Sequence, residues 1–573
     1  MLDTGLGVRC TSTDIHVISG RPVTDHGVVI GATYGLLTEA ESLRLVRTLQ
    51  ENLDPGHVVP EIPWAAVARR RDGSVVATTA TMLASGIFFS EETTQSGTEL
   101  IIATDPGQVV RARTTTTDLN HDYIRRYAVM STNDTDTPYS QVERRSGGTT
   151  LRWHPDRAGQ RCKFHMWCGP AAWPDAHLEG PDTAQQYLEV FDETMAGLVD
   201  RLDVLATTLS GGLDSSFMVA GLARAAGTGD RITAFTHVPL AGALTESIGS
   251  WDPDDSHLAA TVVAMYADKV THQRVRNLDL RQPLDAAHER SQLSWVPVFN
   301  PSNQVWSDEI RDRARALGSE HVLYGTNGNA AFSFQHGYAA EYYLGKGHLH
   351  SLGRIALREQ RNSSWHHSLR QNFLSPAVRR LFPVDDGLQE YARHFGLTRL
   401  LPDRNRNVSG RERYLRWLSG RADGMVAAMN PAARGNVIDP FRSRTLLDLA
   451  AAITPAQWQS TGEPRGFARL LSAGRVPDAV RLRQRRGGQA WDAWFWVRSH
   501  KQRYLDEVDQ LAETAVLGEL VDHDLIRRRI ESWPWDEVHG PDHLDVVAIE
   551  RVLSLGRFTR MTETRLGTLN AAQ

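Results

Sequence analysis

A loop of small and polar residues, Leu209 to Ser216, limits what the middle of this chain can fold into. The apolar residues 204–207 precede it, and residues 216–227, SFMVAGLARAAG, follow it with the pattern of a helix. Gly211 and Gly212 allow the backbone to turn sharply and to approach a ligand. Amides and hydroxyls at the start of a helix attract phosphate, so the segment predicts an anion-binding strand, loop and helix.

The loop is not a Walker phosphate loop, because it has no Lys and lacks the GxxxxGK[ST] spacing. It carries Asp214 instead, and this carboxylate would repel a bare phosphate unless a cation lay between them. We therefore interpret Asp214 as a ligand of Mg²⁺ on a bound pyrophosphate. The alternative is an ordinary Gly-Gly turn in which a Ser or Asp caps the helix.

The chain from Asp182 onward alternates helices with short apolar strands, which predicts parallel βαβ units and an α/β fold. We expect strands at 204–207, 232–239 and 321–329. In an open parallel sheet, ligands gather at the carboxyl ends of the strands, so the polar residues there predict one shared cleft. From residue 355 onward Arg-rich helices predominate, and no third domain is expected.

Residues 27–153 contain short runs rich in Val, Ile and Thr, which predict an antiparallel sheet module. One helix interrupts it at Thr38 to Leu53, where a Thr and Glu start precedes apolar residues at helical spacing. Pro and Gly concentrate at 169–182, and we place the domain boundary there. The expected domains are residues 1–175 and residues 182–573.

Charge and composition exclude several classes of protein. The 573 residues carry 63 Lys and Arg against 68 Asp and Glu, a net charge of -5, so no basic field favours nucleic acid as a partner. Only four of those cations are Lys, and three Cys are too few to staple the chain. No signal-peptide pattern and no run of about 18 apolar residues is present. We expect a cytoplasmic protein without a membrane span.

The segment SGGLDSS resembles the pyrophosphate loop of the ATP-pyrophosphatase superfamily. Its surroundings are similar to class B asparagine synthetases and their relatives, the β-lactam synthetases and lasso peptide cyclases. GTNGNAA, IDPFRSRTLLDLAAAIT and PRGFARLLSAGRVPDAVRLRQRRGGQAWD stand where that family has recognisable blocks. The resemblance implies a glutaminase-like (Ntn-hydrolase type) β-rich α+β domain, followed by a parallel-sheet ATP-pyrophosphatase synthetase domain with a helical C-terminal part.

The resemblance also implies a reaction and a set of binding residues. A carboxylate would attack ATP to give an acyl-adenylate and pyrophosphate, and an amine would then take the acyl group to form an amide. Pyrophosphate and Mg²⁺ would be bound by Ser210, Gly211, Gly212, Asp214, Ser215 and Ser216. Adenine and ribose would be bound near Leu209, Phe235, Thr236 and His237, with Gly325 in the same nucleotide site.

Asp254 and Asp255 resemble the family's polar pair at the start of the helix after the second strand. Solvated acids at a helix start explain them equally well.

The N-terminal module departs from the family at its first residues. Glutamine-hydrolysing members have a nucleophilic Cys at position 2, and this chain has Leu2. Cys10 would take the role only if nine residues were removed. We therefore expect a glutaminase-like domain without ammonia-producing chemistry.

The synthetase half departs at three positions. Asn329 stands where the family has the Asp near the second metal position, and its amide oxygen can still coordinate Mg²⁺ without the charge. Asn436 aligns with a Glu of the family. Arg486 stands where the family has the Lys that stabilises the adenylate, and Arg can neutralise charge but cannot donate a proton. The alternative for Arg486 and its neighbours Arg465, Arg483 and Arg485 is a solvated basic face.

These features together favour an ATP- and Mg²⁺-dependent amide synthetase, most plausibly a lasso peptide or macrolactam cyclase. Its partners would be a peptide or small-molecule carboxylate and amine, with a leader-peptide-binding protein and a protease beside it. The alternatives are asparagine synthesis from aspartate and a noncatalytic nucleotide-binding scaffold. The aromatic blocks 295–306 and 332–343 either line the acceptor channel or fill the core.

Overall fold

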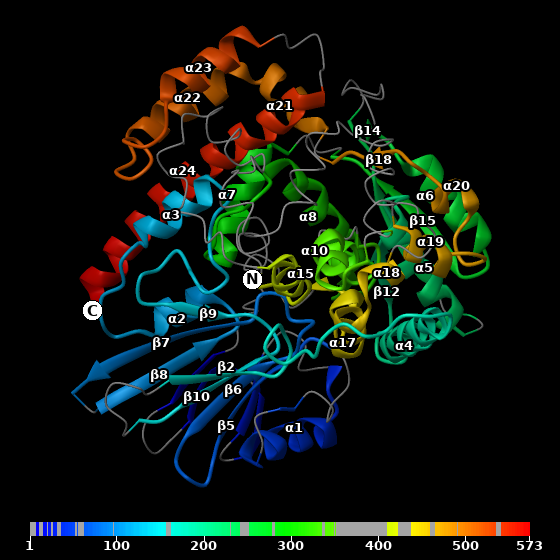
Figure 1. Ribbon diagram of the computed structural model, residues 1–573. Coiled ribbons are helices and arrows are strands. Elements are labelled where there is room, and N and C mark those ends of the chain that lie inside the picture. The colour runs from blue at the N-terminus through cyan, green and yellow to red at the C-terminus, as the bar shows by residue number, and fades with distance from the viewer. Residues whose placement is uncertain are drawn as a thin grey trace.

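Two antiparallel sheets pack face to face in the N-terminal part of the protein, drawn in blue in Figure 1. The strands of the first sheet, in order, are β2 (Ile15–Ser19), β1 (Gly7–Cys10), β8 (Gly97–Ala103), β7 (Ile87–Thr94) and β9 (Glu143–Arg145). Those of the second are β11 (Cys162–Met166), β10 (Thr149–Trp153), β6 (Val75–Thr79), β5 (Ala65–Arg69), β4 (Gly27–Ile30) and β3 (Arg21–Thr24). The predicted antiparallel module is thus present, as two sheets.

The computed structural model describes most of the chain. The described ranges are 7–10, 15–19, 21–24, 27–30, 36–51, 54–55, 62–95, 97–155, 162–227, 229, 231–240, 251–277, 281–334, 338–348, 350, 409–421, 437–458, 465–489, 491–533 and 540–573. Asn436 and the start of the expected C-terminal helices at 355–408 lie outside them.

Helices cover the outer faces of both sheets. Helix α1 (Glu39–Glu51) packs on β5, as expected, and its start is a capping box in which Thr38 and Glu41 exchange hydrogen bonds of 2.9 and 3.2 Å. The prediction of a single helix here was wrong. Helix α2 (Pro106–Ala112) packs on β7 and β8, and α3 (His121–Ala128) follows it. Both are short and start at side-chain caps, Asp105 and Asn120.

The second half is built on a five-stranded, fully parallel sheet. Its order is β15 (Val270–Val275), β13 (Ile232–His237), β12 (Leu205–Thr208), β16 (Val322–Leu323) and β17 (Val437–Ile438). The helices α4 (Asp182–Val199), α5 (Leu213–Ala225), α6 (Ser256–Met265), α7 (Pro283–Ser294) and α8 (Pro301–Ala316) alternate with the first strands. This confirms the predicted parallel α/β arrangement.

One strand prediction was too long. The strand expected at 321–329 ends at Leu323, and Gly328–Ala331 form the short helix α9. The sequence Thr-Asn-Gly-Asn does not favour a strand, and Asn327 turns the chain into the helix.

Helices dominate the described C-terminal region. They are α10 (Ala339–Gly345), α15 (Gly410–Leu418), α17 (Arg444–Ala452), α18 (Pro455–Trp458), α19 (Gly466–Leu471), α20 (Asp478–Arg481), α21 (Asp492–Ser499), α22 (Lys501–Ala512), α23 (His523–Ser532) and α24 (Gly540–Ala572). None of the described helices combines the length and the apolar run that crossing a bilayer requires.

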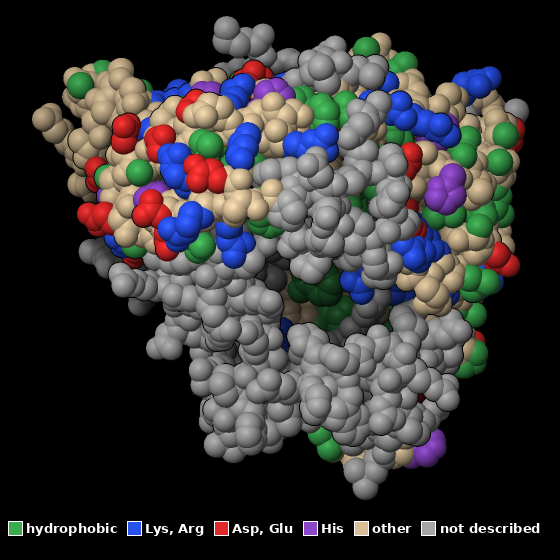
Figure 2. Space-filling model, turned by 90° about the horizontal axis from the view of Figure 1, so that it is seen from above, with side chains coloured by type: hydrophobic (Ala, Val, Ile, Leu, Met, Phe, Trp, Pro, Cys, Tyr) green, Lys and Arg blue, Asp and Glu red, His purple; other side chains and the backbone are tan. Residues whose placement is uncertain are grey.

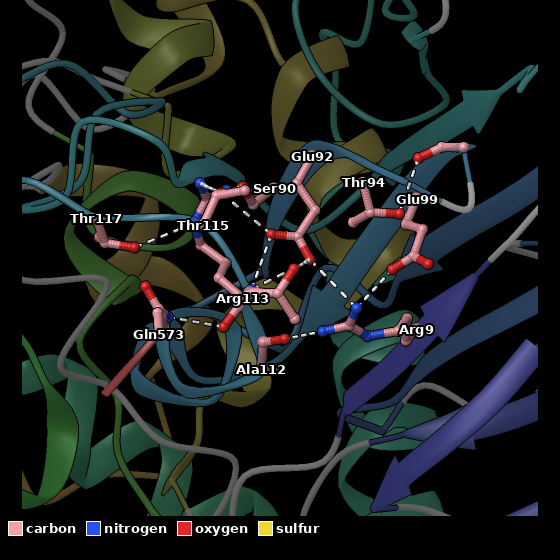
Figure 3. Close-up of polar contacts among 12 residues, drawn as sticks. Arg9, Ser90, Glu92, Thr94, Glu99, Ala112, Arg113, Thr115, Thr117 and Gln573 are labelled. Carbon is pink, nitrogen blue, oxygen red and sulfur yellow. Dashed lines mark hydrogen bonds and ion pairs between the residues drawn. The ribbon is translucent and has the colours of Figure 1, made fainter. Parts of the chain in front are cut away.

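Helix α24 connects the two halves. Its 33 residues extend about 50 Å along one side of the molecule and end beside the N-terminal sheets (Figure 1). Near its end, Asn570 and Thr117 exchange two hydrogen bonds of 3.0 Å. Gln573 Nε2 donates to the carbonyl of Arg113 next to the charged cluster of Arg9, Glu92 and Glu99 on the first sheet (Figure 3).

Candidate active site

The loop between β12 and α5 is closed by its own hydrogen bonds. The Ser210 amide donates to Ser215 Oγ over 3.1 Å, and the Gly212 amide donates to Ser210 Oγ over 3.3 Å. Gly211 has a φ of 69°, and a Cβ there would lie 2.8 Å from the Asp255 carbonyl oxygen, so only glycine fits. In the described structure no side chain caps α5. Its first amides can therefore receive an anion.

Asp214 lies in the first turn of α5, half-buried, with its Oδ1 shielded from solvent. Its Oδ1 has no hydrogen-bond partner among the described residues. Burial raises the pKa of this carboxyl, while the Arg465 guanidinium and the Ser333 hydroxyl oppose the shift. Ser216, two residues further along α5, is also buried, and its hydroxyl has no described partner. An unpaired buried carboxylate oxygen is costly, which indicates a missing cationic partner.

The GTNGN loop after β16 lies against Asp214. A Cβ on Gly328 would be 2.7 Å from Asp214 Oδ1, and one on Gly325 would be 3.8 Å from the Asp214 carbonyl carbon. Asn329 follows on α9 with an exposed side chain, and Arg465 Nη2 donates to its Oδ1 over 3.4 Å. The structure therefore brings Asp214, Gly325 and Asn329 together with Arg465 as the neighbouring cation.

Asp439 is a buried residue of this site that the sequence reasoning missed. Its Oδ2 accepts from the Asn327 amide over 2.7 Å, and its Oδ1 accepts from the Phe441 amide over 3.1 Å. Burial raises its pKa to about 7, although these amides and Arg442 oppose the shift and Asp214 adds to it. Asp439 thus holds the GTNGN loop in place. The only signal was an Asp before Pro-Phe in a block already singled out.

The end of β13 lies beside the same loop. The Leu209 amide donates to the Phe235 carbonyl over 2.8 Å, and Thr236 Oγ1 donates to the Leu209 carbonyl over 2.5 Å. The Phe235 side chain is fully buried, so only its backbone can meet a nucleotide. His237 stacks on Trp306 with ring centroids 5.2 Å apart, and its Nε2 is 3.6 Å from Asp492 Oδ2.

The basic segment near Arg486 is tied to the loop that follows β13. Arg483 contacts Asp252 and Asp255, each over 2.6 Å, and Arg485 contacts Asp252 over 2.7 Å. Arg483 therefore does not belong to a solvated basic face. Arg486 has an exposed side chain, and its backbone pairs with Trp251 in the two-stranded sheet of β14 (Trp251–Asp252) and β18 (Arg486–Gly487).

The two acids at the start of α6 have different surroundings. Asp254 Oδ1 accepts from the Ser256 amide over 2.8 Å, as a helix-start acid does. Asp255 is buried and paired with Arg483.

The aromatic block 332–343 is mainly core, because Phe332, Phe334, Tyr338 and Tyr343 are buried. In block 295–306, Trp306 is half-buried and faces His237.

Seen from above, the molecule has a hollow with hydrophobic and Lys or Arg side chains along the described part of its edge (Figure 2). Within the described residues, no three His, Cys, Asp or Glu side chains gather as a metal-binding group. Mg²⁺ needs only one or two protein carboxylates when it also binds phosphate oxygens. The buried, unpaired Oδ1 of Asp214 and the exposed amide of Asn329 fit such a cation.

Cys10 has none of the properties of an exposed nucleophile. It lies at the end of β1 with no exposed surface, and burial raises the pKa of its thiol to about 12. A thiol without thiolate character is a poor nucleophile.

A parallel α/β sheet and an uncapped helix that begins with an acid after a Gly-Gly loop are features of nucleotide-binding α/β folds. The chain belongs to the asparagine synthase family, because the model of that family, described as asparagine synthase, matches residues 186–550. It is therefore an enzyme, an ATP-dependent ligase that forms C–N bonds. Comparison with curated proteins gives no significant match.

Proposed function

We propose that this enzyme activates a carboxylate as an acyl-adenylate, releases pyrophosphate, and joins the acyl group to an amine of its substrate. The supporting observation is that Asp214 lies in the first turn of the uncapped helix α5 and has one carboxylate oxygen without a hydrogen-bond partner among the described residues. Pyrophosphate would bind to the amides of residues 210–216. Adenine and ribose would lie near Leu209 and the backbone of 235–237.

Charge neutralisation is the main catalytic need of this reaction, because negative charge develops on the α-phosphate and on the attacked carbonyl. Asp214 and Asn329 would hold Mg²⁺, which when bound offsets the charge of the pyrophosphate. Arg465 contacts Asn329 and opposes the rise in the pKa of Asp214, so it is placed to add a fixed positive charge. We propose that Arg486 stabilises the adenylate. The catalytic role proposed for Asn436 falls on a residue outside the described ranges.

The acceptor amine would come from the substrate and not from glutamine. The N-terminal sandwich, residues 1–175, would be a glutaminase-like domain that has lost its chemistry, and residues 182–573 would form the synthetase. The buried Cys10 supports this, since its thiol is not accessible as a nucleophile. A ribosomal peptide closed into a macrolactam is the product that we propose, in the cytoplasm and with a leader-peptide-binding protein and a protease as partners.

The decisive assay measures pyrophosphate and AMP release from ATP with candidate peptides that carry a free carboxylate. The wild-type enzyme should release both only when the carboxylate substrate is present. Asp214→Ala should release neither. AMP formed equally by wild type and variant would refute adenylation at this site.

Asparagine synthesis is the second candidate, favoured by the family match. Aspartate with ammonium chloride, or with glutamine, would then yield asparagine without any peptide. Asparagine formation would replace the macrolactam proposal. ATP binding without turnover across all these substrates would favour a noncatalytic scaffold. That alternative is suggested by the departures from the family at Asn329, Ala330, Asn436 and Arg486.

A further inference from the structure

A cavity of about 760 Å³ lies between α7, α22 and α24. It is lined mainly by one face of α24, together with His288 of α7 and Glu507 and Gln510 of α22. We call it the α24 groove. The α24 residues used below are Arg557, Arg560, Met561, Arg565 and Leu569.

The groove is as long as a short peptide. Its α24 lining runs from Arg557 to Leu569, about 18 Å along the helix axis. An extended chain rises about 3.3 Å per residue, so five or six residues span it. The spacing of Arg557, Met561, Arg565 and Leu569 at intervals of four puts cationic and apolar groups on the same face.

The cations of the groove exceed its acids. Glu507 is buried and is shared by Arg557 and Arg560, at 2.5 and 3.3 Å. Arg557 also contacts Asp285 over 2.8 Å. Arg565 has no carboxylate partner in the described part of the chain, and its Nη1 donates only to the Gln292 carbonyl, over 3.3 Å. One acid lines the groove for three guanidinium groups.

A further guanidinium, outside the groove, lies near Arg565. Arg565 and Arg111 of α2 both lie over the ring of Trp295, 4.3 and 5.1 Å from its centroid. Arg111 likewise has no carboxylate partner among the described residues. Two like charges near one ring repel each other, and a ligand carboxylate bound at Arg565 would relieve that repulsion.

We propose that the α24 groove binds an acidic peptide segment of about six residues in extended form. Its carboxylates would contact Arg560 and Arg565, and its apolar side chains would pack on Met561 and Leu569. This site is separate from the nucleotide loop, and the proposal does not depend on the chemistry proposed above.

The test is fluorescence anisotropy on the full-length protein without ATP, at low salt. The probe is a fluorescein-labelled hexapeptide of alternating Glu and Leu, and the reference replaces each Glu by Gln. We expect the acidic peptide to bind about tenfold tighter or more, with an affinity that falls as salt rises. Equal binding of the two peptides would overturn the proposal, and this comparison leaves the protein unchanged.

Substitutions in the α24 groove test whether the peptide binds there. Arg560→Gln and Arg565→Gln should each weaken the acidic peptide about fivefold, and Arg565→Lys should keep most of the affinity. Arg315→Gln on α8 is the matched control, because its side chain is half exposed and its only carboxylate partner among the described residues is Asp312, one turn earlier in the helix. Loss of affinity equal to that of Arg315→Gln would refute the site. If free glutarate displaced the labelled peptide at a concentration equal to that of the peptide, the site would bind a small carboxylate and the proposal of a peptide ligand would be refuted.

Discussion

Gly328 lies so close to Asp214 that a Cβ at residue 328 would stand 2.7 Å from Asp214 Oδ1. Real Cβ atoms do not come that near to an oxygen, so one of the two segments would have to move. The segments are the first turn of α5 and the first turn of α9, which are more than 100 residues apart in the sequence. Their contact sets the position of the acid that we assign to the metal.

We predict that Gly328→Ala lowers pyrophosphate release about a hundredfold, because a displacement of about 1 Å at a catalytic group has that effect. The free energy of unfolding should fall by about 1–3 kcal/mol through overpacking. Gly197→Ala is the control, since Gly197 is exposed on α4 with no atom near its would-be Cβ. That variant should keep full activity, and its free energy of unfolding should rise by about 0.5–1 kcal/mol. Equal activity of the two variants would contradict the assignment.

We predict that Asp214→Asn abolishes pyrophosphate release but stabilises the ligand-free protein at neutral pH. Burial raises the folded-state pKa of Asp214 above its ordinary value of 3.8. The carboxyl therefore favours the folded state fully below pH 3.8 and loses that contribution as pH rises and it ionises. Urea unfolding at pH 7.5 should show the variant more stable by about 1–3 kcal/mol. At pH 3.5 the two proteins should be alike, and a constant difference across pH would exclude this cause.

We predict different effects for two arginines near the site. Arg465→Gln should cut adenylate formation about a hundredfold, because it removes a fixed charge beside Asp214 and Asn329. Arg486→Ala should lower adenylate formation as well, yet leave the free energy of unfolding within about 0.5 kcal/mol, because its side chain is exposed. Single-turnover AMP formation and thermal melting measure the two effects. Unchanged AMP formation in Arg486→Ala would show that this residue is not the adenylate cation.

We predict that Glu550 makes stability depend on pH. It is fully buried, Ser302 Oγ and Tyr504 OH donate to it over 2.6 and 2.9 Å, and burial raises its pKa to about 7. A raised pKa means that the protonated acid stabilises the fold below pH 4.5, and that this contribution is lost as pH rises through 7. The free energy of unfolding of Glu550→Gln, relative to that of the wild type, should rise by on the order of 3 kcal/mol between pH 4.5 and pH 8. Guanidinium unfolding at several pH values checks this, and parallel curves would contradict it.

The sequence predicted correctly those features that depend on interactions between residues close together in the chain. The capping box of Thr38 and Glu41, the strand, loop and helix around 209–216, and the parallel order of β12 and β13 all follow from neighbouring residues. The predictions that failed were also local in scale. Helices α2 and α3 lie in a region where only strands were expected. The strand expected at 321–329 ends at Leu323, so residues 324–329 were wrongly included in it.

The sequence by itself determined the loop at 209–216, because Gly211 must adopt a positive φ and Asp214 must stand in the first turn that follows it. Tertiary structure alone decided which groups surround that acid. Gly328, Asp439 and Arg465 come from separate segments, and only the packing of α9, β17 and α19 brings them within reach. The physical reason is burial: removing Asp214 from water makes its charge depend on its neighbours in space, which spacing along the chain cannot reveal.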